Sequence, residues 1–504
     1  MRIRVTSFLA GFAAAGTHAA VSRLLAPFFG LGPYLQTVLA AVALLATATG
    51  LALCARADRS SRAVPGPALA ASGAWLALAL WARRPLLLAL EPLGLRLDAA
   101  IASLLLLAPP LVFLGALIPW AAREEAQRGP DAGNAAGRAG ATVLVGAAAA
   151  ALLVPFLLLP WLGATGVGLA LGALQIVAGL WSGRPHRRAA ALTSTVLVLA
   201  LTALAWGPAR RATAGVRAHA QTGAAELRVL ERDGALYLLA DGSIHAVVVP
   251  TLFDGLRRPE AALGLVRLLR PEPGRALILG LRGGSLARRF ADLGWNVDVV
   301  EPDSVAVRLS HVHLGMRPRH ARQLAAEPRA HLRASRERYD VVVLDVFASN
   351  FVPPELVTRE CFAEAARLLR PGGLFALVVE SQGWDDPLVR SLAATARTSF
   401  ATVLALPTGE PPNALGSVVL LAGERELEIR DEALPVPFEH LTEPLAHWNA
   451  IQQVHAWANR FEPSGRGAIV LTDDRNPAEL WGERINLAAR RELHGYFGPR
   501  GGSW

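Results

Sequence analysis

Apolar residues are distributed unevenly along the chain. Residues 1–206 hold long runs of Ala, Leu and Val, whereas residues 207–504 mix polar and apolar positions as globular proteins do. Seven of the runs approach the ~20 residues that a helix needs to cross a bilayer. They cover residues 6–29, 34–54, 67–82, 99–120, 140–161, 164–181 and 189–206. The pattern predicts a multi-pass α-helical membrane domain of about seven helices over 1–206, followed by a soluble part.

The soluble part is predicted to follow a linker at 207–225. Residues 226–250 form short alternating runs around Asp241-Gly242, which is typical of a β-hairpin, so we assign 226–270 to a small β-strand subdomain. From residue 275 the rhythm changes to strand–helix–strand. Strands are predicted at 275–280, 296–301, 339–346 and 373–380, and helices at 286–293 and 354–369. This order predicts a Rossmann-like α/β domain over 271–504.

Composition removes several classes of function. The chain has no Lys, so all 50 of its Lys-plus-Arg residues are Arg. A Walker A phosphate loop and a Schiff-base lysine both need an amine, and both are excluded. The net charge of +9 does not point to nucleic acid, because much of the Arg lies in short loops between apolar runs. The His residues show no metal-ligand spacing, and Cys54 and Cys361 are not expected to form a disulfide.

The positions of Arg predict an orientation in a cell (inner) membrane. Loops on the N-terminal side carry eleven Arg residues, namely Arg2, Arg4, Arg56, Arg59, Arg62, Arg123, Arg128, Arg138, Arg184, Arg187 and Arg188. The opposite short loops carry only Arg83, Arg84 and Arg96. The positive-inside rule therefore places the N-terminus in the cytoplasm. Seven spans would then put the soluble domain outside, and six or eight would put it inside. The first run also resembles a signal peptide, although its apolar stretch continues to Phe29.

A Gly-rich turn follows the first strand of the α/β domain. Gly280, Gly283 and Gly284 lie between that strand and a predicted helix, and Glu301 ends the next strand, 21 positions after Gly280. Glycines let a ligand approach the backbone, and an acid at this distance accepts hydrogen bonds from ribose hydroxyls. The alternative is a purely structural turn. Asp345 ends a further strand, where it is a candidate base or cation-binding group, or a cap for the segment that follows.

Four motifs in this half resemble the spermidine synthase family, and its membrane-fused branch most. They are Leu-Ile-Leu-Gly-Leu-Arg-Gly-Gly-Ser (277–285), Val-Val-Glu-Pro-Asp (299–303), Tyr-Asp-Val-Val-Val-Leu-Asp-Val-Phe (339–347) and Leu-Thr-Asp-Asp-Arg-Asn-Pro (471–477). The resemblance covers roughly residues 225–485. It implies a class I methyltransferase-like fold with a small N-terminal β subdomain. It also implies transfer of an aminopropyl group from decarboxylated S-adenosylmethionine to a small-molecule amine.

The resemblance assigns roles to individual residues. Asp345 is the implied catalytic acid–base residue, Glu301 binds ribose, and Glu327 lies on the adenine side. The implied cofactor-binding set is Gly280, Arg282, Gly283, Gly284, Ser285, Glu301, Asp303 and Glu327. The implied substrate-binding set is His245, Glu260, Asn350, Asp473 and Asp474. The co-substrate is decarboxylated S-adenosylmethionine or S-adenosylmethionine, with no metal.

The chain also departs from the family pattern. Arg282 stands where the family usually has its middle glycine, and His245 replaces a substrate-side Gln. Arg258 and Pro259 fall where a Tyr-His pair is expected, while Glu260 is kept. The nucleoside half of the pattern is therefore better preserved than the amine half. Two alternatives to aminopropyl transfer stay open: an S-adenosylmethionine-dependent methyltransferase, and a non-catalytic membrane protein that senses a nucleoside or a polyamine.

The Arg asymmetry gives a testable orientation. Reporters fused after residues 60, 130 and 186 should give a cytoplasmic signal, because those loops carry most of the positive charge. A reporter after residue 215 then identifies the side of the soluble domain. Paired alkaline phosphatase and fluorescent protein fusions provide the readout. An external signal at any of the first three positions would contradict the predicted orientation.

Overall fold

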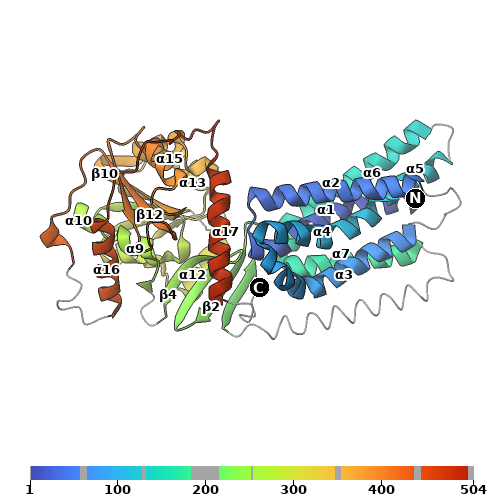
Figure 1. The fold of residues 1–504 in the computed structure, drawn as a ribbon, viewed down its shortest axis with the longest axis horizontal. Coiled ribbons are helices and arrows are strands. Elements are labelled where there is room, and N and C mark those ends of the chain that lie inside the picture. The colour runs from blue at the N-terminus through green and yellow to red at the C-terminus, as the bar shows by residue number, and fades with distance from the viewer. Residues whose placement is uncertain are drawn as a thin grey trace. The chain divides into compact units, whose positions relative to one another are not determined.

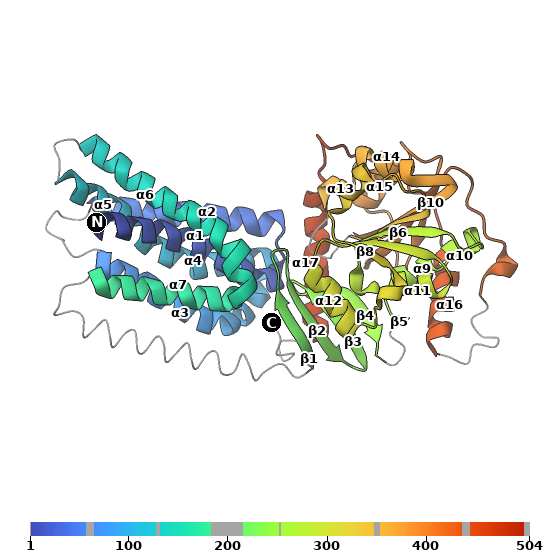
Figure 2. The same cartoon turned by 180° about the vertical axis from the view of Figure 1, so that it is seen from behind.

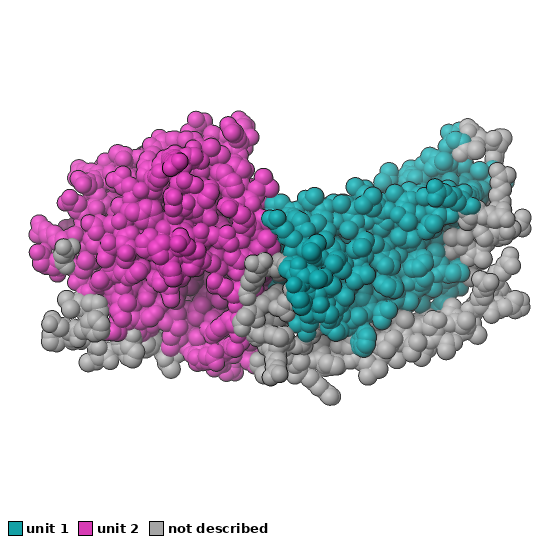
Figure 3. All heavy atoms as spheres, viewed as in Figure 1, with its two compact units in different colours: residues 1–214, 220–225, 497–504 teal, residues 215–219, 226–496 magenta. Residues whose placement is uncertain are grey.

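The computed structural model describes residues 2–56, 65–127, 132–182, 215–250, 254–346, 353–435 and 444–497. The chain divides into two compact units (Figure 3). The first comprises Met1–Ala214, Ala220–Ala225 and Phe497–Trp504, and the second Gly215–His219 and Glu226–Tyr496. Each unit has its own architecture, so each is described separately.

The first unit is a bundle of long helices (Figure 1). They are α1 (Arg2–Phe29), α2 (Pro33–Arg56), α3 (Pro65–Leu90), α4 (Leu95–Gly115), α5 (Leu117–Ala126), α6 (Ala132–Leu153) and α7 (Leu159–Ser182), with short helical turns η1 (Glu91–Leu93) and η2 (Val154–Leu158). Four helical segments among the described residues are long and apolar enough to cross a membrane: Ile3–Phe29, Pro33–Arg56, Arg96–Ala126 and Gly133–Trp181. The fourth has 49 residues: it runs from α6 through η2 into α7, and α7 is interrupted by a non-helical Gly163 (φ 69°).

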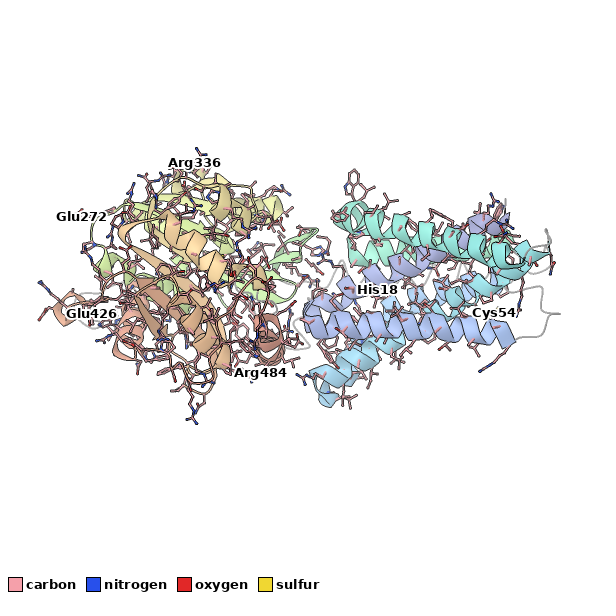
Figure 4. The ribbon with its side chains drawn as sticks, turned by 90° about the horizontal axis from the view of Figure 1, so that it is seen from above. His18, Cys54, Glu272, Arg336, Glu426 and Arg484 are labelled. Carbon is pink, nitrogen blue, oxygen red and sulfur yellow. The ribbon has the colours of Figure 1, made fainter. Side chains whose placement is uncertain are left out.

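Five of the seven predicted spans lie within these four segments, and a sixth, 67–82, lies within α3. The exception is 189–206, which lies outside the described residues. Many large apolar side chains on the bundle face outward, among them Leu44, Phe156 and Trp161, which are 74%, 76% and 82% exposed. Apolar surface of this kind suits a lipid environment rather than water. Cys54, labelled on α2 in Figure 4, is a free thiol, as is Cys361 in the second unit.

Glycines set the closest helix contacts in the bundle. A Cβ atom on Gly11 of α1 would overlap the Val143 carbonyl of α6, and one on Gly146 of α6 would overlap the Phe8 carbonyl of α1. Helices α2 and α4 pack in the same way: a Cβ atom on Gly50 of α2 or on Gly115 of α4 would overlap a backbone carbonyl of the other helix. Small residues at such crossings let helix backbones pack directly, which is how helices associate in lipid, where the hydrophobic effect is weak.

The second unit contains two sheets. The smaller one has five strands in sequential order, of which β2 to β5 pair antiparallel: β1 (Val216–Gln221), β2 (Glu226–Arg232), β3 (Ala235–Ala240), β4 (Ser243–Val249) and β5 (Asp254–Gly255). The predicted hairpin at Asp241-Gly242 joins β3 to β4. Strand β1 falls within the segment 207–225 that the sequence assigned to a linker. The structure therefore extends the β subdomain towards the N-terminus.

The larger sheet has seven strands in the order β11-β12-β10-β9-β6-β7-β8. The strands are β6 (Arg275–Leu279), β7 (Asn296–Val300), β8 (Arg322–Leu324), β9 (Tyr339–Leu344), β10 (Leu369–Gln382), β11 (Thr402–Pro407) and β12 (Leu415–Gly423). β12 pairs antiparallel with both β10 and β11, and the other neighbours are parallel. This is the class I methyltransferase-like arrangement, and all four predicted strands are present in it.

Helices cover both faces of this sheet (Figures 1 and 2). They are α9 (Arg258–Leu263), α10 (Val266–Leu269), α11 (Ser285–Asp292), α12 (Ser304–His313), α13 (Pro328–Ala334), α14 (Arg359–Leu368), α15 (Pro387–Ala396), α16 (Pro444–Ala458) and α17 (Ala478–Phe497), with short turns η4 (Arg282–Gly284), η5 (Pro318–His320), η6 (Pro354–Leu356) and η7 (Asp431–Ala433). Alternate strand residues supply the two cores. Leu277 and Leu279 pack with Phe362, whereas Ile278 packs with Phe290 on the other face.

The glycine contacts in the bundle generate a stability prediction. Gly146→Leu would force α1 and α6 apart, because its side chain has to displace the Phe8 carbonyl. We expect a loss of at least about 1–3 kcal/mol in unfolding free energy, as for other overpacked sites. Thermal unfolding of the full chain in detergent measures it. Gly137→Leu, on the same helix but with no atom within 4 Å of its added Cβ, is the control and should change the midpoint little. Equal losses in the two variants would contradict this packing.

Candidate functional site

The candidate site lies where neighbouring parallel strands end. The Gly280 turn follows β6, Glu301 follows β7, Asp345 follows β9, and Glu380 lies near the end of β10. Because β7, β6, β9 and β10 are adjacent in the sheet, their carboxyl ends share one edge. In open α/β sheets, ligands bind outside this edge. The topology therefore brings the Gly-rich turn close to Glu301, which is predicted to bind ribose, and to Asp345, which is predicted to be catalytic.

The turn between β6 and α11 is tightly packed. Gly280, Gly283 and Gly284 all have positive φ (97°, 78° and 85°), the region in which L side chains are strained. A Cβ on Gly280 would also overlap the Asp345 carbonyl. Arg282 lies in the same turn with φ 44°, although it is not glycine. A non-glycine residue in this region is uncommon, and such residues cluster at functional sites.

Glu301 is tied to the turn by its carboxylate. Its Oε2 accepts a hydrogen bond from the Leu281 N–H at 3.1 Å, and its Oε1 accepts one from the Asp303 N–H at 3.0 Å. Burial raises its pKa, against the effect of these two hydrogen bonds. Asp303 caps α12, where its side chain accepts from Val305 N–H and Ala306 N–H. The acid predicted to bind ribose is thus positioned at the turn, and Asp303 shapes the helix start behind it.

Asp345 is held by a buried arginine. Arg257, which precedes α9, donates to both carboxylate oxygens, at 2.7 Å to Oδ2 and 3.2 Å to Oδ1. Its Nη1 also donates to Glu260 Oε1 at 3.2 Å, while the Ser285 hydroxyl donates to Glu260 Oε2 at 2.6 Å. The Asp345 side chain is only 1% exposed. Two predicted residues, Glu260 and Ser285, therefore join the same cluster through Arg257.

A second arginine approaches the same carboxylate. Arg282 Nε lies 3.4 Å from Asp345 Oδ1, and Arg282 Nη2 lies 3.6 Å from Glu380 Oε1. Burial acts to raise the pKa of Asp345, but Arg257 and Arg282 outweigh it and hold that pKa below its ordinary value. Burial raises the pKa of Glu380, although both arginines oppose it. Glu380 is thus the better proton acceptor of the two near neutral pH.

His245 and Glu260 are also affected by the cluster. Burial lowers the pKa of His245 well below its ordinary value, and Arg282 and Arg257 lower it further, so the imidazole is neutral. Burial raises the pKa of Glu260 despite the nearby Arg257. The fixed positive charge of this cluster therefore comes from Arg257 and Arg282, and His245 adds none.

A cavity of about 560 Å³ opens beside the cluster. Its wall includes Glu380, Glu410 and Glu492, with Tyr237 and Tyr496 at the contact between β3 and α17. The two tyrosine hydroxyls are 2.8 Å apart. Glu410 pairs with Arg258 at 3.0 Å, and burial together with Glu410 raises the pKa of Glu492. The cavity is acidic, and Glu380 connects it to Arg282.

The remaining predicted residues lie elsewhere or outside the described residues. Glu327 is exposed and precedes α13, and Asp474 is exposed too. Asp473 accepts hydrogen bonds from Arg329 and from the Thr358 hydroxyl, which ties its segment to α13 and α14. Asn350 is outside the described residues. In this structure the Leu-Thr-Asp-Asp motif is therefore attached to the rest of the domain through Asp473.

Sequence reasoning missed four charged residues of the site. Arg257, Glu410 and Glu492 had no local signal, because their positions depend on contacts distant in sequence. Glu380 had one, since it closes the predicted strand 373–380 as Glu301 closes an earlier strand. Among the described residues, no group of three or more His, Cys, Asp and Glu side chains is arranged to hold a metal ion.

Parts of this chain are similar to known proteins. No family profile matches the chain. A polyamine aminopropyltransferase of Vibrio vulnificus is 26% identical over 226 residues, covering 42% of this chain and 71% of that protein. An N-terminal histidine N-methyltransferase of Emericella nidulans is 25% identical over 283 residues, 50% of this chain but only 49% of that protein. A probable spermidine synthase structure from Corynebacterium glutamicum is 20% identical, with a TM-score of 0.39, over 43% of this chain and 81% of that one.

The Arg257–Asp345 pair generates a stability prediction. Arg257→Met should destabilise the second unit by about 3 kcal/mol, because it leaves a buried carboxylate without its hydrogen-bonded partner. Adding Asp345→Asn should recover part of the loss, since the uncompensated charge is then removed. Denaturant unfolding of the full chain measures both variants. Arg258→Met is the control: its side chain is 40% exposed, and its surface pair should contribute under about 1 kcal/mol. Equal losses at 257 and 258, or strictly additive effects at 257 and 345, would contradict the pairing.

Proposed function

We propose that the second unit, whose motifs resemble those of the spermidine synthase family, transfers an aminopropyl-type group from an S-adenosyl sulfonium donor to the nitrogen of an amine. The observation that carries the proposal is the acidic cavity beside the carboxyl edge of the sheet. Glu380, Glu410 and Glu492 line it together with two tyrosines. A protonated amine fits a concave site of this charge.

The donor is assigned to the turn on the other side of Glu380. Glu301 keeps further lone pairs on both carboxylate oxygens beyond the two backbone hydrogen bonds that it accepts. These lone pairs are suited to the two hydroxyls of a ribose. The positive φ values of Gly280 and Gly283 shape the turn that presents the Leu281 N–H to Glu301. The predicted cofactor-binding role of the turn is kept in this proposal.

The reaction needs no group beyond the two substrates and a proton acceptor. The amine nitrogen attacks the carbon bonded to the sulfonium sulfur, the carbon–sulfur bond breaks, and its electron pair stays on sulfur. A neutral thioether nucleoside leaves, and the new ammonium gives up a proton. We assign the proton to Glu380, which lines the cavity and has a raised pKa. Asp345, the residue that the family resemblance makes catalytic, becomes a positioning residue for Arg257 and Arg282 in this scheme.

The four apolar helical segments support placing this enzyme at a membrane. An enzyme with a multi-pass anchor acts on an amine close to the bilayer, so the bundle is assigned a role in locating the substrate. Methyl transfer from S-adenosylmethionine is the second candidate function. The observation that favours it is the similarity to the Emericella nidulans protein, which is named as a methyltransferase, so the experiment below tests methyl transfer as well.

Product analysis tests the proposal. The full chain in detergent, supplied with S-adenosylmethionine or its decarboxylated form and with diamines and longer polyamines, should release 5′-methylthioadenosine. Glu380→Gln should lower turnover by roughly 10²–10⁴-fold, as expected on losing a proton acceptor. Glu426→Gln changes an exposed acid, labelled in Figure 4, and should leave turnover unchanged. Release of S-adenosylhomocysteine instead would show methyl transfer, and release of neither nucleoside would contradict both candidate functions.

A further inference from the structure

Arg282 is a buried cation without hydrogen-bond acceptors. Its side chain is 5% exposed, and Nε, Nη1 and Nη2 all lack a hydrogen-bond partner within the described part of the chain. Its two ion pairs, at 3.4 and 3.6 Å, bring opposite charges close without forming hydrogen bonds. A guanidinium carries five N–H donors, and burying them unpaired is costly in free energy. Such a group is expected to have an acceptor that the described residues do not provide.

The neighbouring acids do not supply that acceptor. Arg257 already engages both oxygens of Asp345, so Asp345 is directed at Arg257 rather than at Arg282. Glu380 lines the cavity on the other side. The Arg282 backbone is fixed by the strained turn at φ 44°, which limits how far its side chain can move towards either acid. The Arg282 guanidinium is thus held in place while its N–H groups make no hydrogen bond to the described residues.

The position of Arg282 relates it to the donor. It directly follows Leu281, whose N–H binds the Glu301 carboxylate. In the proposed function, a nucleoside anchored at Glu301 lies against the turn that carries Arg282. On its other side Arg282 lies 3.6 Å from Glu380, which lines the cavity. The part of the donor between adenosine and amine is the amino-acid portion of S-adenosylmethionine, or the aminopropyl chain of its decarboxylated form.

We propose that Arg282 binds the α-carboxylate of the donor, so that this protein uses an S-adenosyl donor that keeps its carboxylate. A planar guanidinium binds a carboxylate through two parallel hydrogen bonds, which is the geometry that its free donors offer. A decarboxylated donor places a cationic aminopropyl chain in the same space, where Arg282 repels it. The inference rests on the proposed function for the placement of the nucleoside, and it names the donor class of that site.

A donor that keeps its carboxylate also determines which group the amine receives. If the amine attacks the carbon next to sulfur on the amino-acid side, the carbon–sulfur bond breaks and 5′-methylthioadenosine leaves, as in aminopropyl transfer. The group gained by the amine is then 3-amino-3-carboxypropyl, which is heavier than aminopropyl by one carbon dioxide. The amine loses one proton, and no oxidant or reductant is required.

Calorimetry with three ligands tests the inference on the full chain in detergent. S-adenosylmethionine should bind at least tenfold tighter than its decarboxylated form, because hydrogen bonds between charged groups are the strong ones. Arg282→Gln should abolish that preference. The affinity for 5′-methylthioadenosine, which has no carboxylate, should not change in the variant. Arg282→Lys should keep part of the preference, and Arg308→Gln, at an exposed position on α12, is the control and should keep all of it.

Each outcome separates this inference from the proposed function. Equal binding of the two donors by the wild-type chain would overturn the inference. A parallel loss of 5′-methylthioadenosine binding in Arg282→Gln, with an unchanged melting temperature, would overturn it too, since it would show that Arg282 shapes the nucleoside site. Arg282-dependent preference for S-adenosylmethionine, without release of 5′-methylthioadenosine in the presence of any amine, would support the carboxylate contact while the proposed transfer fails.

Discussion

A buried carboxylate at the end of a sheet strand has to be neutralised, and the arrangement of this site follows from how Asp345 meets that requirement. Desolvating a charge costs several kcal/mol unless a partner with good geometry compensates it. Arg257 provides two hydrogen bonds, and it comes from the short segment between β5 and α9. The pair therefore connects the end of the small sheet to the carboxyl edge of the large one. It also commits Asp345 to a cation that the protein carries, whereas Glu380 lines the cavity.

The turn after β6 adds a second constraint. Its glycines bring the backbone against Asp345 and against β4, where a Cβ on Gly283 would overlap Ala246. Little space remains for a side chain at the middle of the turn, yet Arg282 is there, buried and with positive φ. The strain of that backbone conformation and the loss of hydration of the guanidinium both destabilise Arg282 in this position. The proposed contact with a donor carboxylate would offset both of these unfavourable contributions.

The sequence predicted the local parts of this structure and missed the distant ones. Strands such as 339–346 were readable because a run of buried apolar residues ends in an acid. Helix α14 was predicted from 354 but begins at Arg359, because the Thr358 hydroxyl accepts from Cys361 N–H and caps it there. Strand β1 was missed because its alternating residues are mostly small or polar. The motifs identified Asp345 and Glu301, but Arg257 lies 88 positions from Asp345, and no local pattern reports such a pairing.

The two halves of the candidate site have opposite charge, and in the proposed function this charge selects a substrate for each half. The cavity presents Glu380, Glu410 and Glu492, which in that proposal attract a polyamine. Arg282, 3.6 Å from Glu380, repels the same amine. The proposal therefore places a nitrogen of the amine at Glu380, at the boundary between the two regions. An anionic group has the reverse preference: it is repelled by the cavity and attracted to Arg282. Because Glu380 lies 3.6 Å from Arg282, the proposed function brings the amine and the donor together at these two residues. In that proposal, the opposite charges of Glu380 and Arg282 supply the positioning that a transfer between two cationic substrates would otherwise lack.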